Sequence, residues 1–242
     1  MFIGNGFTFW SGQPIVNDFA LSLYSPIFTA LTPFLVGLFE VDISIDAVIK
    51  YPKLYQVGQV NGLFNAREQI RWGLNALYCG VVISLVVFGS IQHYTDGPAD
   101  SGRPIGLEEA GVILFTCLLL TVDLQLVFVV SNYTWIHFTV LVLSLLSWFL
   151  FLIIFEFIPL SWFSTNSLFG LYTGIMASSP TYILLSTLVP VLCVLPWATS
   201  EAFQFVSKPR DETIINELET RDLSTASLND PAKSRKFNEV TS

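Results

Sequence analysis

Apolar residues in this chain are grouped into five long continuous runs, separated by polar segments. Each run has roughly the 20 residues that a helix needs to cross about 30 Å of hydrocarbon. The runs are continuously apolar rather than alternating, which argues against the strands of a membrane barrel. The pattern therefore predicts an all-α fold, a polytopic membrane helix bundle with five full transmembrane spans, at about residues 17–39, 72–91, 110–130, 136–160 and 181–206.

The two ends of the chain differ from these runs. The first residues include several apolar side chains, but a helix of ten residues is only about 15 Å long. We expect either a membrane-surface segment or the last turns of a membrane helix there. The end of the chain is polar and of mixed charge, which is typical of a disordered tail. The expected organisation is a partial helix at residues 1–12, a membrane domain at residues 13–206 and a mostly disordered cytosolic tail at residues 207–242.

The positions of the positive charges agree with membrane spans. The chain has no lysine or arginine between Arg103 and Lys208. A positive charge at bilayer depth costs a few kcal/mol or more. Ten of the 11 basic residues lie in the loop after the first expected span or in the tail. Because basic segments stay in the cytosol, we expect an exoplasmic N-terminus, five spans and a cytosolic C-terminus.

Composition favours the same class of protein. Hydrophobic residues make up 52% of the chain and charged residues 12%, about half of the roughly 25% that is usual in globular domains. The net charge of −8 does not indicate a nucleic-acid partner. Cys79, Cys117 and Cys193 are far apart and form no C-x-x-C pair, so we expect neither a disulfide framework nor a metal site. His93 and His137 have no second ligand at metal spacing and are expected to be structural.

A few acidic and amide side chains lie in or near the expected spans. Asp123 and Gln125 are deep in the third span, where a charged group is a functional candidate by default. The more frequent alternative is a packed polar contact between helices, with Asp123 protonated. Asp18, Glu156 and Glu201 lie near span ends, so we expect them to reach the water at the headgroups.

Prolines interrupt the first and the last expected spans. Pro26 and Pro33 lie in the first, and Pro190 and Pro196 in the last. A proline removes a backbone hydrogen bond and usually kinks the helix. Kinked helices line transport paths but are also common in ordinary bundles, so both interpretations remain open for the first span.

The most specific stretch is the loop YPKLYQVGQVNGLFN at residues 51–65. It resembles the Y-P-x-L-Y-x-x-G-Q-x-N-x-x-F-N signature that follows the sixth membrane helix of the lipid-flipping (type IV) P-type ATPases. The matching residues are Tyr51, Pro52, Leu54, Tyr55, Gly58, Gln59, Asn61, Phe64 and Asn65.

Further ordered matches extend the resemblance over roughly residues 9–205. FWSGQ resembles the F-x-S-G-Q that closes the family's fifth helix, and SLYSPIFTAL resembles S-L-Y-N-x-x-F-T-S-L in the sixth. GLFEVD resembles G-V-F-D-Q-D, DLQ falls where many members have N-C-Q, and YTWI resembles F-T-W-I. These segments occupy residues 9–13, 22–31, 37–42, 123–125 and 133–136.

The resemblance implies that the chain starts inside the family's fifth membrane helix and continues through helices six to ten. It implies a membrane-support and partial lipid-path portion of an ATP-driven flippase that moves phospholipid from the outer to the cytosolic leaflet. The family binds Mg-ATP in catalytic domains whose D-K-T-G motif this sequence lacks. We therefore expect the chain by itself to bind no cofactor and to hydrolyse no ATP.

The resemblance also implies partners and a location. The partners are phospholipid, the bilayer and the family's two-span glycosylated accessory subunit, and not nucleic acid. The location is the eukaryotic plasma membrane or the Golgi and endosomal membranes.

One departure from the family pattern concerns the lipid path. The sixth-helix asparagine that lies near the headgroup path in the family is Ser25 in this chain. Ser25 and Thr29 are four residues apart and would share one side of a helix. The alternative is that both hydroxyls bond back to their own helix. The expected substrate-path residues are Ser25, Thr29, Pro33, Asp123 and Gln125.

Two other functions remain open from the sequence. The first is a stand-alone, non-enzymatic membrane scaffold or interaction protein derived from such an ATPase. The second is an unrelated transporter or channel, against which the loop motif argues. The partial helix at residues 1–12 favours an incomplete gene product, and an in-frame D-K-T-G motif upstream would decide the question.

Overall fold

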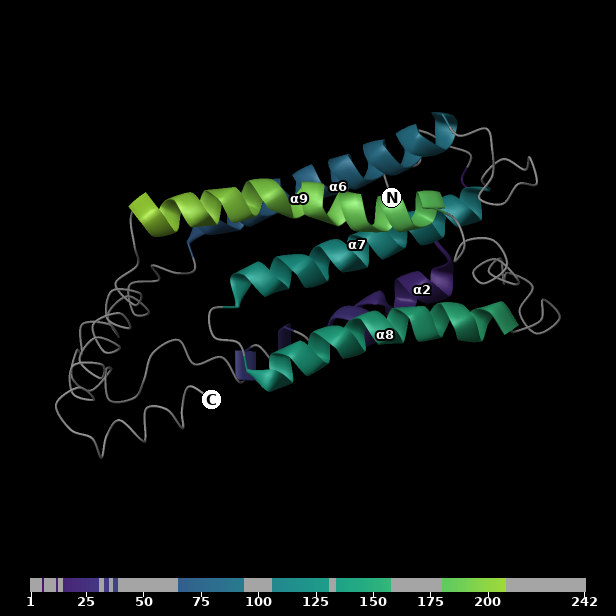
Figure 1. Cartoon of the computed structure of the whole chain (residues 1–242), viewed down its shortest axis with the longest axis horizontal. Helices are drawn as coiled ribbons and strands as arrows, with labels where there is room; N and C mark the ends of the chain where they lie inside the picture. The colour runs from purple at the N-terminus through teal and green to yellow at the C-terminus, as the bar shows by residue number, and fades with distance from the viewer. Residues whose placement is uncertain are drawn as a thin grey trace. The chain divides into compact units, whose positions relative to one another are not determined.

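The computed structural model describes residues 6, 12, 15–30, 33–34, 37–38, 65–93, 106–130, 134–157 and 180–207. Throughout these residues the regular structure is helical, which confirms the all-α prediction (Figure 1). A short α-helix is followed directly by a π-helix, and four long helices come after them. The elements are α2 (Asp18–Leu23), η1 (Tyr24–Thr29), α6 (Ala66–His93), α7 (Leu107–Val129), α8 (Trp135–Phe157) and α9 (Pro180–Ser207).

Four predicted spans are confirmed as helices that are long and apolar enough to cross a bilayer, namely α6, α7, α8 and α9. The second predicted span, residues 72–91, is the one whose bounds differ most, since α6 already begins at Ala66. Hydropathy marks the part of a helix that suits hydrocarbon, whereas the backbone hydrogen bonds continue into polar residues beyond it. For α6 the apolar run therefore underestimates the length of the helix.

Other predictions fall wholly or partly outside the described residues. The first predicted span is described as α2, η1 and short helical pieces at 33–34 and 37–38. Of the partial helix at residues 1–12, only Gly6 and Gly12 are described, and nothing is described after Ser207. The orientation across a bilayer stays a prediction.

The chain divides into two compact units. The first consists of Met1–Glu40 and Trp72–Ala198, and the second of Val41–Arg71 and Thr199–Ser242. The first unit holds α2, η1, α7, α8 and most of α6 and α9. It therefore contains nearly all the buried apolar contacts of the described residues.

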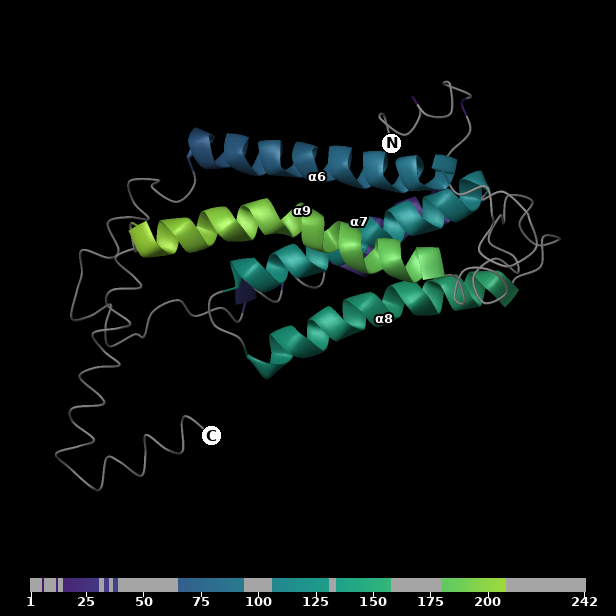
Figure 2. The ribbon, with the colours of Figure 1, turned by 45° about the horizontal axis from the view of Figure 1, so that its top comes forward.

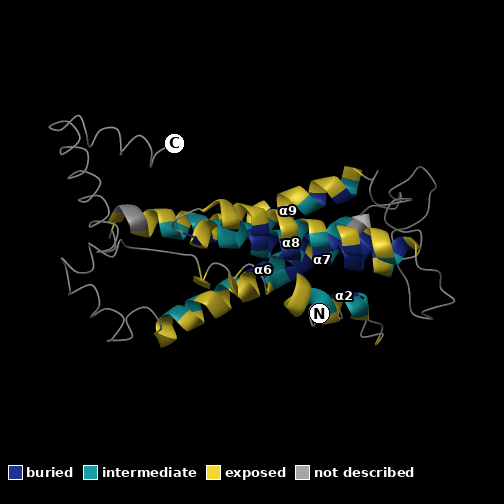
Figure 3. Ribbon diagram, turned by 90° about the horizontal axis from the view of Figure 1, so that it is seen from below, coloured by how far each residue is buried: buried dark blue, intermediate teal, exposed yellow. Residues whose placement is uncertain are grey.

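Helix α7 is the central helix of the first unit. Of its most apolar stretch, 44% is buried, against 28–33% for the three other long helices. Figure 1 shows α7 between α8 and α9, and in Figure 2 α7 crosses α9. Exposed residues follow the outer sides of the long helices, as expected for surfaces that face lipid (Figure 3).

An aromatic cluster joins η1, α7 and α8. The Trp148 ring centre lies 4.7 Å from that of Phe115 and 5.4 Å from that of Phe28. The indole Nε1 of Trp148 donates a hydrogen bond to Thr116 Oγ1 at 3.0 Å. Thr116 Oγ1 in turn lies 3.4 Å from the hydroxyl of Tyr182 on α9. A single threonine hydroxyl thus connects α7 to both neighbouring helices.

The residues before α2 pack tightly against the start of α7. Ile15 and Val16 are buried, and the Asn17 side chain accepts a hydrogen bond from the Phe19 N–H at 3.0 Å, capping α2. The backbone carbonyl of Ile15 lies directly over Gly111, where a Cβ atom would overlap it. This approach is possible only because residue 111 is glycine.

The fold makes a testable prediction about α6 and α9. Cys79 Sγ donates to the Cys193 carbonyl at 3.7 Å and Cys193 Sγ to the Cys79 carbonyl at 3.9 Å, and both residues are buried. Because reciprocal contacts bring the two side chains together, a membrane-permeant oxidant such as copper phenanthroline should form a disulfide between them. Mass spectrometry of unreduced proteolytic peptides would detect the linked pair.

Cys117 provides the control for this experiment. Its thiol donates instead to the Leu185 carbonyl at 3.6 Å. Cys117→Ser should therefore leave the yield of linked peptide unchanged, whereas Cys79→Ser and Cys193→Ser should abolish it. A Cys79–Cys117 linkage as the main product would contradict the helix arrangement.

Candidate functional site

The π-helix η1 is the least regular feature of the described helices. Its register is set by a backbone hydrogen bond from Ala30 N to the Ser25 carbonyl, five residues earlier, at 3.0 Å. Pro26 lies inside this segment and has no N–H to bond the preceding turn, which explains why an α-helix is not continued there. Such π-helical turns inside helices are rare and often occur at functional sites.

Three of the predicted path residues lie on or just after η1. Ser25 is exposed, as is Pro33, which is helical. Thr29 is half-buried, and its hydroxyl donates to the Tyr24 carbonyl at 3.0 Å. For Thr29 the alternative of a bond to its own helix therefore holds, and the exposed hydroxyl in this turn belongs to Ser25.

A buried polar contact joins η1 to α7 and α8. Ser144 Oγ on α8 lies 2.7 Å from the carbonyl oxygen of Phe28 in η1. The same Oγ lies 3.1 Å from Asp123 Oδ2 and 3.3 Å from Oδ1. Asp123 is 6% exposed and Ser144 7% exposed. Asp123 is thus in a packed interhelical contact.

Gln125 does not join this contact. It is half-buried on α7, two residues from Asp123, and residues at that spacing lie on different sides of a helix. The structure therefore brings Asp123 to the π-helix and leaves Gln125 elsewhere.

Sequence reasoning missed Ser144. It is a small hydroxyl residue within an apolar run, and such residues most often bond to their own helix. The sequence carries no signal for this contact, because the rotation of α8 about its axis decides which side Ser144 faces.

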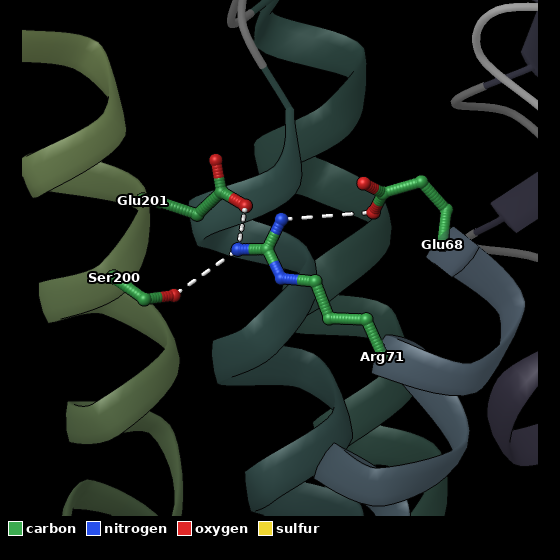
Figure 4. A network of polar contacts seen from close by, with 4 residues as sticks. All are labelled: Glu68, Arg71, Ser200 and Glu201. Carbon is green, nitrogen blue, oxygen red and sulfur yellow. Dashed lines mark hydrogen bonds and ion pairs between the residues drawn. The ribbon is translucent and has the colours of Figure 1, made fainter. Parts of the chain in front are cut away.

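A second polar cluster lies in the other compact unit, where α6 begins and α9 ends (Figure 4). Arg71 donates to Glu201 Oε1 at 2.8 Å and to Ser200 Oγ at 3.1 Å. Glu68, one turn before Arg71, lies 3.6 Å from it. The side chains of Arg71 and Glu201 are 25% and 31% exposed, so the pair is worth about 0.2–1 kcal/mol by the standard of surface ion pairs. The cluster fastens α6 to α9 but contributes little energy.

Three acidic residues near the ends of spans were predicted to reach the water at the headgroups, and the outcomes differ. Asp18 is exposed, as expected. Glu156 is only 5% exposed, so the prediction that it reaches headgroup water is wrong. Glu201 is partly exposed but bound to Arg71. Hydropathy indicates how far along a helix a residue lies, but not on which side of the helix. The rotation of α8 about its own axis turns Glu156 inward.

Other predicted residues are described only in part. Nearly all of the loop motif, residues 51–64, lies outside the described residues. Its last residue, Asn65, is exposed just before α6, and its carbonyl accepts a hydrogen bond from Gln69 N at 3.1 Å. His137 is buried, and its Nδ1 accepts from Thr134 N at 3.3 Å at the start of α8, which fits a structural role.

Comparison with known proteins decides the family. The family described as phospholipid-translocating P-type ATPase C-terminal matches residues 1–210. The chain belongs to this family. Its helices correspond to the C-terminal part of a type IV P-type ATPase, which confirms the resemblance seen in the sequence.

Individual relatives agree with this assignment. The chain is 31% identical to the probable phospholipid-transporting ATPase 5 of Arabidopsis thaliana over 94% of its own length and 18% of the relative's. It is 31% identical to the phospholipid-transporting ATPase 6 of the same plant over 88% of its length and 17% of the relative's. A phospholipid-transporting ATPase of Schizosaccharomyces pombe is 34% identical over 59% of the chain and 11% of that protein. The chain thus spans less than a fifth of the length of these relatives.

Proposed function

We propose that this chain forms the supporting membrane helices and one wall of the lipid path in an ATP-driven transporter that moves phospholipid from the outer to the cytosolic leaflet. Its relatives are named as phospholipid-transporting ATPases, and the family match covers all the described helices. In this proposal Mg-ATP binds to catalytic domains that lie outside this chain, in other parts of the ATPase. This chain contributes no phosphate-binding motif.

The observation that carries the proposal is the exposed Ser25 in the π-helical turn. Irregular backbone at membrane depth is tolerated where it is buried in protein or lines a polar cavity. One side of this turn is held by the aromatic cluster and by Ser144. On the other side Ser25 and Pro26 are exposed, so a headgroup can approach them.

Several further statements belong to the same proposal. Residues 13–206 act as the membrane domain, and residues 207–242 form a cytosolic tail. The two-span glycosylated accessory subunit is the expected protein partner. The plasma membrane and the Golgi and endosomal membranes are the expected locations.

The test is a chimera in which this chain replaces the matching segment of a full-length relative. We expect the chimera to take up fluorescent phospholipids into cells, and Ser25→Asn to change which headgroup is preferred while protein level stays the same. Asparagine reaches further than serine and has two donors and an acceptor, so it recognises a headgroup differently. Ser25→Leu, which removes the hydroxyl, should slow uptake.

The matched control is Ser22, one turn earlier. Ser22 is also exposed, but its hydroxyl is engaged by the Asp18 carbonyl at 2.8 Å. Ser22→Asn should leave headgroup preference unchanged. If Ser25→Asn and Ser25→Leu both leave preference and rate untouched, Ser25 is only a packing residue. A folded chimera that moves no lipid would favour the non-enzymatic scaffold.

A further inference from the structure

The contact at Ser144 has more acceptors than its hydroxyl can serve. A serine hydroxyl carries one hydrogen and two acceptor lone pairs. Three oxygens face Ser144 Oγ, the Phe28 carbonyl at 2.7 Å and the two Asp123 carboxyl oxygens at 3.1 and 3.3 Å. The shortest distance assigns the hydrogen to Phe28. A second full hydrogen bond between Ser144 and Asp123 then needs a hydrogen on Asp123.

The Phe28 carbonyl has a reason to need this hydrogen. The π-helical segment ends at Thr29, directly after Phe28, and the backbone passes from the five-residue register of Ala30 N to Ser25 O to the four-residue register of Phe34 N to Ala30 O. Phe28 is only 2% exposed, and a buried carbonyl is stabilised by a hydrogen-bond donor. The hydroxyl of Ser144 is in position to supply that donor at 2.7 Å.

The charges around Asp123 agree with a neutral carboxyl. The ion pairs of the described residues join Arg71 to Glu68 and to Glu201, and none of them involves Asp123. Asp123 is 6% exposed. An isolated buried carboxylate without a cation is strongly disfavoured, whereas a neutral carboxyl that donates one hydrogen bond is not.

We propose that Asp123 is a neutral hydrogen-bond donor in a relay that holds the π-helical turn. The carboxyl hydrogen of Asp123 goes to Ser144 Oγ, and the Ser144 hydroxyl hydrogen goes to the Phe28 carbonyl. Asp123 and Ser144 are therefore positioning residues for η1 and, on the proposed function, for the exposed Ser25 in it.

Hydrogen exchange on the complete chain in detergent tests the relay. The probe is the amide of Ala30, which closes the π-helical turn on Ser25, together with other amides of η1. Asp123→Leu and Ser144→Ala each remove a donor, and we expect exchange in η1 to become about 5- to 100-fold faster. Asp123→Asn keeps a neutral donor at the same place, so its exchange should stay within about twofold of the parent chain.

Thr121 supplies a matched control on α7. It is buried near Asp123, but its hydroxyl donates to the Cys117 carbonyl of its own helix at 2.6 Å. Thr121→Val should leave exchange in η1 unchanged. Exchange that is as fast in Asp123→Asn as in Asp123→Leu would mean that an ionised carboxylate is required and would overturn the proposal. Unchanged exchange in Ser144→Ala would also overturn it.

An infrared measurement covers the case in which the leucine or alanine variant does not fold. The difference spectrum of the parent chain minus Asp123→Asn should contain the carbonyl stretch of a protonated carboxyl group, which lies above the amide bands. The other acids that are buried in the described part of the chain, Glu109 and Glu156, are the same in both proteins and cancel. A carboxylate band in its place would refute the neutral state. Neither experiment measures transport, so its failure would leave the proposed function untouched.

Discussion

Replacing Trp148 with alanine is expected to lower the free energy of unfolding by about 3–5 kcal/mol, the usual loss for a buried large aromatic side chain. Trp148 is 2% exposed and packs against rings from η1, α7 and its own helix, with Phe151 5.6 Å away. Lipid tails are as apolar as the bundle core, so membrane helices associate through close packing rather than through the hydrophobic effect. The loss of these ring contacts should therefore separate η1, α7 and α8.

Two further variants divide the expected effect into its parts. Trp148→Phe keeps a ring but removes the indole donor to Thr116, so it should lose less, about 1 kcal/mol for the hydrogen bond. Trp135 on the same helix is 80% exposed, and Trp135→Ala should change stability by less than about 0.5 kcal/mol. Denaturant unfolding of the chain in detergent, followed by helical circular dichroism, measures all three. Equal losses for Trp148→Ala and Trp135→Ala would show that the cluster does not hold the bundle.

The second large effect is expected at Gly111. Gly111→Ala places a Cβ atom on the backbone carbonyl of Ile15, and a backbone atom cannot rotate away as a side chain can. The buried segment at Ile15 and Val16 must then move off α7, at about 1–3 kcal/mol for overpacking, and more for Gly111→Leu. Denaturant unfolding of the chain in detergent measures this loss. Hydrogen exchange in α2 should also become faster.

Gly80 is the matched control for this substitution. It lies in α6, and among the described residues no atom lies within 4 Å of an added Cβ there. Gly80→Ala should be neutral or stabilising by about 0.5–1 kcal/mol, since alanine is the better helix former. If Gly111→Ala behaves like Gly80→Ala, the segment before α2 does not lie against α7.

Both predictions concern contacts that α7 makes in the first compact unit. The aromatic cluster lies on one part of this helix, and the close approach at Gly111 on another. The aromatic cluster includes Phe28 of η1, and the close approach at Gly111 involves Ile15, just before the first predicted span. The π-helical turn is therefore supported by packing and by the Ser144 hydrogen bond.

The spans and the family could be predicted from the sequence. The free energy of moving a side chain into hydrocarbon depends mainly on that side chain, so apolar runs identify α6 to α9 without any knowledge of their neighbours. The loop motif identifies the family because many residue types match in order, and the match over residues 1–210 agrees with it. Pro26 correctly marked an irregular turn in the first span, whereas Pro190 and Pro196 lie inside the continuous helix α9.

The polar contacts inside the bundle could be decided only by the tertiary structure. Whether Glu156 faces inward, or whether Ser144 meets Phe28 rather than its own helix, depends on how each helix is rotated about its axis. Those rotations are set by packing between residues far apart in the chain, such as Trp148 with Phe28 or Gly111 with Ile15. Apolar runs without a clear polar stripe carry no signal for rotation. The sequence by itself therefore determined which segments enter the membrane, and three-dimensional packing decided which of their few polar groups meet.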